Sequence, residues 1–436
     1  MKEQVIKSLS ENQNRFADAT QQSLFSKENF QTLLSPSLEE NQKAIESIAL
    51  AMVNDQQLTP GIAIAAGDAH TIYTKQCYGK LSDDNSKTVN SDTIYDLASM
   101  TKLFTVLSLF QLKEKGLLIF SDTIGKYCSN FQKISHCSLK DLMEFHISMR
   151  TDGRIDENGL DANEAENRLF NVYETPITDS FLARPYNDLS AMALRYVIES
   201  VSGQTYYEYL KENIIVPLNM NSTAPHIINP LNFASCDFER RIIKGNYQII
   251  NTQKGMPHDK KAAISKKNST SLCGHAGLFS TVDDLAKLAQ GLLTEKILSK
   301  ASLIEIGQKQ MGTIINGKAT QFLGKLVYTK CPNPATSEVH HALSGCAFSS
   351  PGFTGTHFTL DVLNGIFYIV LSNRCYNRVT QIIPEEGKSI DDYLNTENRI
   401  PWPDEKTYPS SIDYVYKKDL LIEAVLQNVL LSKSQS

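Results

Sequence analysis

Segments typical of β-strands lie near both ends of this 436-residue chain, and this arrangement constrains the fold more than any other feature. Near the start, Pro60-Gly61 precedes an apolar run at 62–66, and after a short turn a second run follows at 71–74, so we predict a hairpin. Near the other end, two strand-like runs occur at 354–361 and 365–372. The segment between the two β-rich ends has mostly helical patterns. The simplest architecture is therefore a sheet built from both ends of the chain, with a helical middle inserted.

The first 36 residues differ from the rest of the chain because they are rich in Asn, Gln and Ser, which predicts a polar extension. The folded part begins at Ser37, where a capping box with Glu40 indicates the first helix. A closing helix is predicted over 411–432. The predicted units are an extension at 1–36 and a domain at 37–436, with sheet-forming parts at about 37–120 and 280–436 and a helical insert at about 121–279.

Composition excludes several classes of function. The net charge of −5 and the absence of basic runs interleaved with aromatics argue against nucleic-acid binding. The N-terminus has no apolar signal core, and no segment approaches the ~20 apolar residues of a membrane span, so we expect a cytoplasmic protein. Eight scattered cysteines without a C-x-x-C pair predict reduced, buried thiols. His258 and His275 fit no zinc spacing and are predicted to be loop or core residues, so we expect neither metal nor cofactor.

Ser99 and Lys102 form the first candidate for chemistry. The apolar run that follows them predicts a buried helix, which places Ser99 in its first turn, where free N–H groups favour an oxyanion. Three residues make about one helical turn, so Lys102 should lie beside Ser99. Burial disfavours the lysine ammonium and would allow Lys102 to act as the base for Ser99. The motif alone is also compatible with a surface serine that caps a helix next to a solvated lysine.

Four further blocks follow in an order that makes coincidence improbable. They are Tyr186-Asn-Asp188, Gly255-Met-Pro-His-Asp259, Gly274-His-Ala-Gly-Leu-Phe-Ser-Thr281 and Phe348-Ser-Ser-Pro-Gly-Phe-Thr-Gly-Thr356. With Ser99-Met-Thr-Lys102, they make residues 58–375 resemble the β-lactamase-related serine hydrolases. This family includes class C β-lactamases, penicillin-binding D,D-peptidases and esterases, and the blocks at 255–281 are similar to its esterase-like branch.

The resemblance implies an α+β fold, in which helices flank an antiparallel sheet and a mostly helical subdomain is inserted. Tyr186 would stand over Ser99 and Lys102 and pass a proton to the leaving group, while Asp188 would hold the Lys102 ammonium. The backbone N–H groups of Ser99 and Phe353 would form the oxyanion hole. The expected partner is a small-molecule ester, amide or peptide.

The third motif departs from the family pattern. It normally begins with Lys or His, whereas this chain has Ser350, Pro351 and Gly352 at its three positions. Loss of the cation weakens the case for β-lactam hydrolysis or for cleavage of acidic peptide ends. Pro351 also lacks an N–H, which predicts a strand at the edge of the sheet. In the second motif, Asp188 replaces the Asn of the lactamases, and a carboxylate there would favour charged Lys102 and shift the base role towards the tyrosine.

Three functions remain open at this point. The leading one is hydrolysis of a small ester or amide through a Ser99 acyl-enzyme. A second is transfer of the same acyl group to an amine or alcohol, which a pocket that excludes water would favour. The third is a non-catalytic binding protein that keeps the fold, which is motivated by Ser350 and Pro351 in the third motif.

Overall fold

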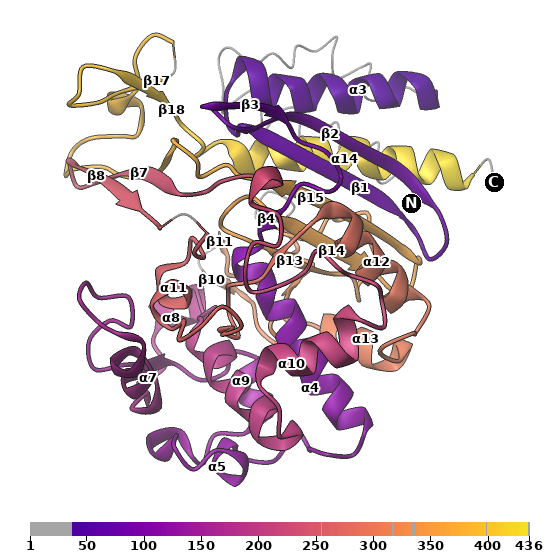
Figure 1. The fold of residues 1–436 in the computed structure, drawn as a ribbon, viewed down its shortest axis with the longest axis vertical. Coiled ribbons are helices and arrows are strands. Elements are labelled where there is room, and N and C mark those ends of the chain that lie inside the picture. Colours follow the sequence, from indigo (N-terminus) through magenta and orange to yellow (C-terminus); the bar gives the residue numbers. More distant parts are fainter. Residues whose placement is uncertain (1–36, 254, 316–317, 334–336, 398, 435–436) are drawn as a thin grey trace.

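The computed structural model describes residues 37–253, 255–315, 318–333, 337–397 and 399–434, so the predicted extension at 1–36 lies outside the described residues. Its centre is a seven-stranded antiparallel sheet in the order β12-β13-β14-β15-β1-β2-β3 (Figure 1). The strands are β1 (Gly61–Asp68), β2 (Ile72–Ser82), β3 (Asn85–Thr88), β12 (Tyr328–Thr329), β13 (Phe348–Pro351), β14 (His357–Asp361) and β15 (Ile366–Ser372).

The two ends of the chain meet in the middle of this sheet. β1 pairs with β15 from Ile62 opposite Ser372 to Asp68 opposite Ile366, and β1 pairs with β2 as the predicted hairpin. The prediction of an antiparallel sheet built from both ends is therefore confirmed. The run predicted at 354–361 begins as a strand only at His357, because the residues before it form a loop.

Helices cover both faces of the sheet. Alternate residues of β1 point to opposite sides, so Ile62 and Ile64 pack beneath α3 (Leu38–Leu50) and α14 (Tyr414–Lys433). Ala63 and Ala65 belong to the larger core on the other face. That core includes residues of α4 (Thr101–Glu114), α9 (Leu189–Ser202) and α12 (Val282–Leu293).

Short helices surround the larger core and build the lower part of the molecule (Figure 1). They are α5 (Ile124–Tyr127), α6 (Leu139–Met143), α7 (Ala162–Phe170), α8 (Asp179–Ala183), α10 (Tyr206–Leu210), α11 (Lys260–Ile264) and α13 (Lys300–Gly307). No helix among the described residues is both long and apolar enough to cross a membrane. The eight cysteines are all described and all free, and six are buried as predicted, whereas Cys77 and Cys346 are only half-buried.

Two strands of a second sheet lie within the segment predicted to be mostly helical. β7 (Phe238–Ile243) and β8 (Asn246–Asn251) form an antiparallel pair, and β16 (Val379–Ile383) joins β7 in parallel. Further short pairs are β4 (Tyr95–Asp96) with β9 (Phe279–Ser280), β5 (Met149–Arg150) with β6 (Tyr173–Glu174), β10 (Ile314–Ile315) with β11 (Lys318–Ala319), and β17 (Arg399–Pro401) with β18 (Thr407–Pro409). The sequence did not predict the β7–β8 pair.

Candidate active site

Ser99 lies in a tight turn between β4 and α4. The turn is a single 3₁₀ helix at Ala98–Met100, and Ala98 has a positive φ of 46°. This backbone conformation costs a residue with a Cβ about 1–2 kcal/mol, and such strain is typical of functional sites. The buried carboxylate of Asp96 stabilises the turn, because it accepts hydrogen bonds from the amides of Ala98 at 2.8 Å and His258 at 2.7 Å.

Lys102 lies one helical turn beyond Ser99, as predicted. Its ammonium donates hydrogen bonds to Ser99 Oγ at 3.0 Å, to Asp188 Oδ1 at 2.7 Å and to the carbonyl of His275 at 3.3 Å. The side chain is only 1 % exposed. The lysine is therefore fixed between the serine hydroxyl and a carboxylate from the start of α9.

Tyr186 completes the group around the serine. Its hydroxyl faces Ser99, and its ring centroid lies 4.7 Å from the ammonium of Lys102. The ring is fixed by Tyr328, with 5.4 Å between centroids, and by Phe145, which follows α6, with 5.3 Å. Burial and the negative charge of Asp188 raise the pKa of Tyr186, and the neighbouring Ser99 hydroxyl only partly opposes this. The tyrosine is thus neutral at rest and holds a proton that it can donate.

Asp188 lies in a chain of alternating charges. Its second carboxylate oxygen is 3.1 Å from Lys261 Nζ, Lys261 Nζ is 3.4 Å from Asp259, and Asp259 is 2.9 Å from His275 Nε2. Burial alone would raise the pKa of Asp188, but the charges of Lys102, His275 and Lys261 hold it below its usual range. Burial would likewise lower the pKa of Lys261, but Asp259 and Asp188 raise it above its ordinary value.

The third-motif loop is tied to the turn that carries Ser99. Thr354 Oγ1 donates to the carbonyl of Asp96 at 2.7 Å, and Thr356 Oγ1 donates to the carbonyl of Leu97 at 3.1 Å. A Cβ on Gly352 would lie 2.4 Å from the Leu97 carbonyl oxygen, so only glycine fits between the two segments. The two segments are therefore closely packed against each other.

This packing bears on the predicted oxyanion hole at Ser99 and Phe353. Ser99 belongs to the turn, and Phe353 belongs to the loop. Over the described ranges, no protein acceptor is bonded to the backbone N–H of either residue. Both donors are therefore available to a substrate oxygen. The side chain of Phe353 is 41 % exposed and stacks on His258, with 5.6 Å between ring centroids.

The third-motif positions place no cation at the site. Ser350 is buried in β13, and Pro351 ends the strand opposite His357 of β14. The prediction that this strand is the sheet edge is wrong, because β12 lies outside β13. However, β12 pairs only with Phe348 and Ser349, so the sheet does not require an N–H from Pro351 on that side.

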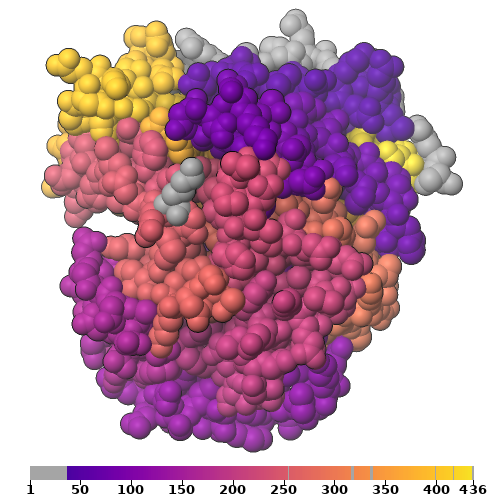
Figure 2. Space-filling view, viewed as in Figure 1, coloured from indigo at the N-terminus to yellow at the C-terminus, as the bar shows by residue number. Residues whose placement is uncertain are grey.

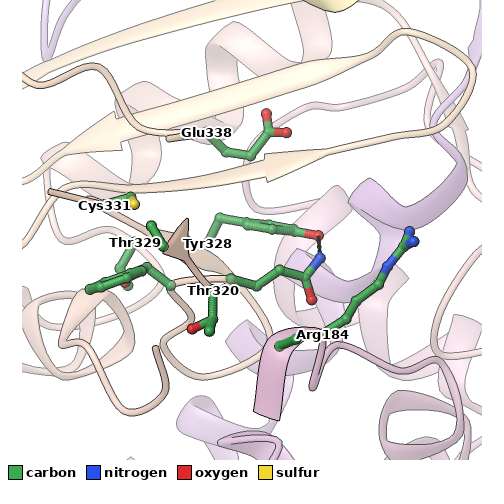
Figure 3. A pocket seen from close by; sticks show the side chains of 10 residues that line it. Arg184, Thr320, Tyr328, Thr329, Cys331 and Glu338 are labelled. Carbon is green, nitrogen blue, oxygen red and sulfur yellow. Dashed lines mark hydrogen bonds between the residues drawn. The ribbon is translucent and has the colours of Figure 1, made fainter. Parts of the chain in front are cut away.

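A cavity of about 350 Å³ lies next to Tyr186. Figure 3 shows its wall, in which the Gln321 amide donates to the Tyr328 hydroxyl at 3.4 Å and Arg184 extends alongside. The cavity borders the candidate site, since Tyr328 stacks on Tyr186 and the amide of Tyr186 donates to Gln321 at 3.3 Å. Glu338 on the opposite wall is 3.4 Å from Lys418, whereas no described carboxylate lies within ion-pair distance of Arg184.

A notch indents the surface between the β7–β8 pair and the lobe that contains α7 (Figure 2). In the same view, α11 and α8 lie beside this notch (Figure 1). Lys261 is on α11, and α8 leads into the segment that carries Tyr186. The notch is therefore an open side of the molecule close to the elements that build the site.

Two sets of potential metal ligands lie near the site, but cationic side chains already neutralise them. The sets are Asp188, Asp259 and His275, and Glu239, His258 and Cys375. Lys261 bridges the two carboxylates of the first set. In the second set, Glu239 accepts a hydrogen bond from Arg241 at 2.8 Å. We therefore assign both sets to ion pairs within the protein rather than to a metal.

The structure brings together all the predicted side chains, Ser99, Lys102, Tyr186 and Asp188. Sequence reasoning missed Lys261, which no motif indicated. His258 and His275 are buried, as predicted for core histidines, but each faces a carboxylate that the sequence did not place. Asp259 and His275 belong to the two blocks at 255–259 and 274–281. The resemblance of both blocks to one family was the signal that could have indicated this pair.

Comparison with known proteins identifies the family. A family model described as Beta-lactamase matches residues 38–385. The chain belongs to the Beta-lactamase family. A putative D-alanyl-D-alanine carboxypeptidase of Escherichia coli (strain K12) is 26 % identical to it over 359 residues, which cover 76 % of this chain and 79 % of the relative.

Solved structures share the fold of this chain. A penicillin-binding protein homologue from Caulobacter crescentus has a TM-score of 0.63 and 14 % identity, covering 89 % of this chain and 97 % of its own. EstCE1, described as a hydrolase with promiscuous acyltransferase activity, has a TM-score of 0.60 and 16 % identity, covering 78 % and 95 %. These matches confirm the predicted α+β fold, and the family model confirms the predicted family. Family membership supports serine hydrolase or acyltransferase chemistry in general.

Proposed function

We propose that this β-lactamase-family chain is a serine hydrolase that forms an acyl-enzyme on Ser99 and acts on a small ester or amide. The observation that carries the proposal is the convergence on Ser99 of the Lys102 ammonium at 3.0 Å and the Tyr186 hydroxyl. Two backbone N–H groups without protein acceptors lie on the segments that meet there. A nucleophile, a proton carrier and oxyanion donors are the parts that acyl transfer requires.

In the proposed reaction, the reactive form is the minor one in which Tyr186 has released its proton to solvent beside the Lys102 ammonium. Ser99 Oγ attacks the substrate carbonyl carbon, and its proton passes to the Tyr186 oxygen. The N–H groups of Ser99 and Phe353 donate hydrogen bonds to the resulting oxyanion. Tyr186 then protonates the leaving alcohol or amine as the bond to it breaks, which leaves an ester on Ser99. A water molecule then gives a proton to the Tyr186 oxygen and attacks this ester, and Tyr186 returns the proton to Ser99 Oγ as the acid is released.

The substrate class follows from the walls of the site. The cavity beside Tyr186 lies on the side of the proton donor, where a leaving group would sit. Its lining is polar and includes Arg184, so esters and peptides that carry a carboxylate belong in the first screen together with neutral esters. The names of the curated relatives support peptide substrates, whereas the uncharged third motif argues against strong dependence on an acidic peptide end at that position.

Transfer of the acyl group to an amine or alcohol is the second candidate. The cavity beside Tyr186 favours it, since a bound acceptor there would be placed near the residue that handles its proton. Product analysis with added amines and alcohols separates the two outcomes. Acid as the sole product supports hydrolysis, and an amide or a new ester supports transfer.

The first experiment is intact mass spectrometry after treatment with a fluorophosphonate. We expect one adduct on the wild-type protein and none on Ser99→Ala. Ester and peptide turnover that disappears in the same variant would then support the hydrolase. If the folded wild-type protein forms no adduct, the proposal is wrong, and a binding protein with this fold becomes the better interpretation.

A further inference from the structure

Lys261 is an unassigned charge within reach of the catalytic group. Its ammonium bridges two carboxylates, 3.1 Å from Asp188 Oδ2 and 3.4 Å from Asp259 Oδ2. Asp188 uses its other oxygen to bind Lys102 at 2.7 Å. One carboxylate is therefore shared by two lysines. The side chain of Lys261 is 24 % exposed, so its ammonium lies at the border between the site and solvent.

Charged groups of both signs surround this carboxylate. Burial lowers the pKa of His275, but Cys273 and the nearby carboxylates of Asp259 and Asp188 raise it to a net value of about 9. His275 is therefore charged at neutral pH, as is Lys261, whose pKa the neighbouring carboxylates raise. Lys261 also faces the carboxylate of Asp156, so three carboxylates lie around these cations.

Lys261 is a cation close to the catalytic group in a chain whose third motif, Ser350, Pro351 and Gly352, provides none. We propose that Lys261 is a positioning residue that shares the Asp188 carboxylate with Lys102 and so limits the negative charge that Asp188 directs at Tyr186, the proton carrier for Ser99. The inference rests on the proposed function, since it assigns Lys261 to the activation of that serine.

The physical consequence concerns the pH at which Ser99 becomes reactive. Without Lys261, the full charge of Asp188 would act on Tyr186, which would then keep its proton to a higher pH. Lys261 also lowers the pKa of Tyr186, against the effects of burial and Asp188. The charged and titratable groups that face Lys261 and the tyrosine are Asp156, Asp188, Asp259, Lys102, His275 and Tyr328. Their net effect is measured as one apparent titration.

The test is the rate of fluorophosphonate labelling of Ser99 in the full chain as a function of pH. We expect Lys261→Met to move the acidic limb of the profile up by about one pH unit, the scale of one unit charge several ångströms away in a partly exposed site. Labelling near neutral pH then falls about tenfold and recovers at high pH. Lys261→Arg retains the charge and should retain the wild-type profile.

Lys260→Met is the matched control. Lys260 is the neighbouring residue on α11, but it is exposed and donates to Asn158 at 2.6 Å instead of reaching the site. The control removes the same charge from the same helix, so we expect an unchanged profile. A shift of equal size in this control would show that Lys261 acts only through the general charge of the surface, which overturns the proposal.

Other results of the labelling experiment would also overturn the proposal for Lys261. If Lys261→Met slows labelling equally at every pH, or leaves the profile unchanged, Lys261 has at most a structural role and the proposal is wrong. In either case the labelled wild-type protein leaves the proposed function intact. If the folded wild-type protein is not labelled at any pH, the proposed function fails and this inference fails with it.

Discussion

Replacing Asp188 by Asn separates the two roles of this residue, counter-charge and hydrogen-bond acceptor. The shape and one oxygen remain, but Lys102 and Lys261, at 2.7 and 3.1 Å from the carboxylate oxygens, lose their common negative partner. Removing one member of a buried ion pair costs about 3–5 kcal/mol. Because Asp188 is 25 % exposed and the amide oxygen still accepts one hydrogen bond, we expect a lower loss of about 2–3 kcal/mol in the free energy of unfolding.

The effect of this substitution should depend on pH. Burial raises the pKa of Asp188, but Lys102 and the other nearby cations hold it below its usual range. A carboxyl group of this kind stabilises the fold above its unfolded-state pKa of about 4, and the contribution is lost as the pH falls through the folded-state pKa. The difference between Asp188→Asn and wild type should therefore be largest near neutral pH and should decrease as the pH falls below about 4.

Urea unfolding measured at neutral and acidic pH tests both statements. The control is Glu39→Gln, which breaks an ion pair with Lys43 of similar length, 2.7 Å, but on an exposed helix face, so we expect no measurable change. An Asp188→Asn protein that unfolds at the wild-type urea concentration near neutral pH would refute the reasoning. Packing alone would then account for the position of Lys102.

Two further substitutions test the geometry of the site. Tyr186→Phe keeps the stacked ring and removes the hydroxyl, so we expect ester turnover to fall by about 10²–10⁴-fold with little change in the thermal midpoint of unfolding. Ester turnover above one-tenth of the wild-type value would contradict the proton-transfer role of Tyr186. Gly352→Ala places a Cβ 2.1 Å from Thr356 Oγ1 and 2.4 Å from the Leu97 carbonyl oxygen, so we expect a loss of about 1–3 kcal/mol in thermal unfolding and slower labelling of the nucleophile. The control is Gly345→Ala, where an added Cβ meets nothing within 4 Å. If Gly345→Ala and Gly352→Ala destabilise the protein equally, the steric explanation is wrong.

Short-range geometry explains which parts of the site could be predicted. The spacing of Ser99 and Lys102 is fixed by one helical turn, so their proximity follows from the sequence once the helix is recognised. The proximity of Tyr186 depends on the folding of distant segments and was accessible only through resemblance. Lys260 and Lys261 are adjacent in a short helix, and nothing local distinguishes the exposed lysine from the one that reaches Asp188.

The same reasoning applies to the fold. The strands at 62–66 and 365–372 have long apolar runs, and the sheet that they form was predicted. The β7 strand contains Glu239, Arg240 and Arg241, which do not suggest a buried strand. Glu239 is nevertheless fully buried, because Arg241 and Thr380 of β16 donate hydrogen bonds to it. Such compensation arises only from tertiary contacts, so the alternation pattern could not reveal it.

The backbone at Ala98 connects the fold to the proposed chemistry. Its positive φ is unfavourable for alanine, so the turn persists only because its surroundings stabilise it. Asp96 supplies that stabilisation on both sides, since its carboxylate binds the Ala98 amide and its carbonyl accepts from Thr354 of the third-motif loop. The orientation of Ser99 and the position of the Phe353 N–H therefore depend on the same buried residue. A third motif without a cation still needs its glycine and threonines, because they hold the loop against the turn that carries Ser99.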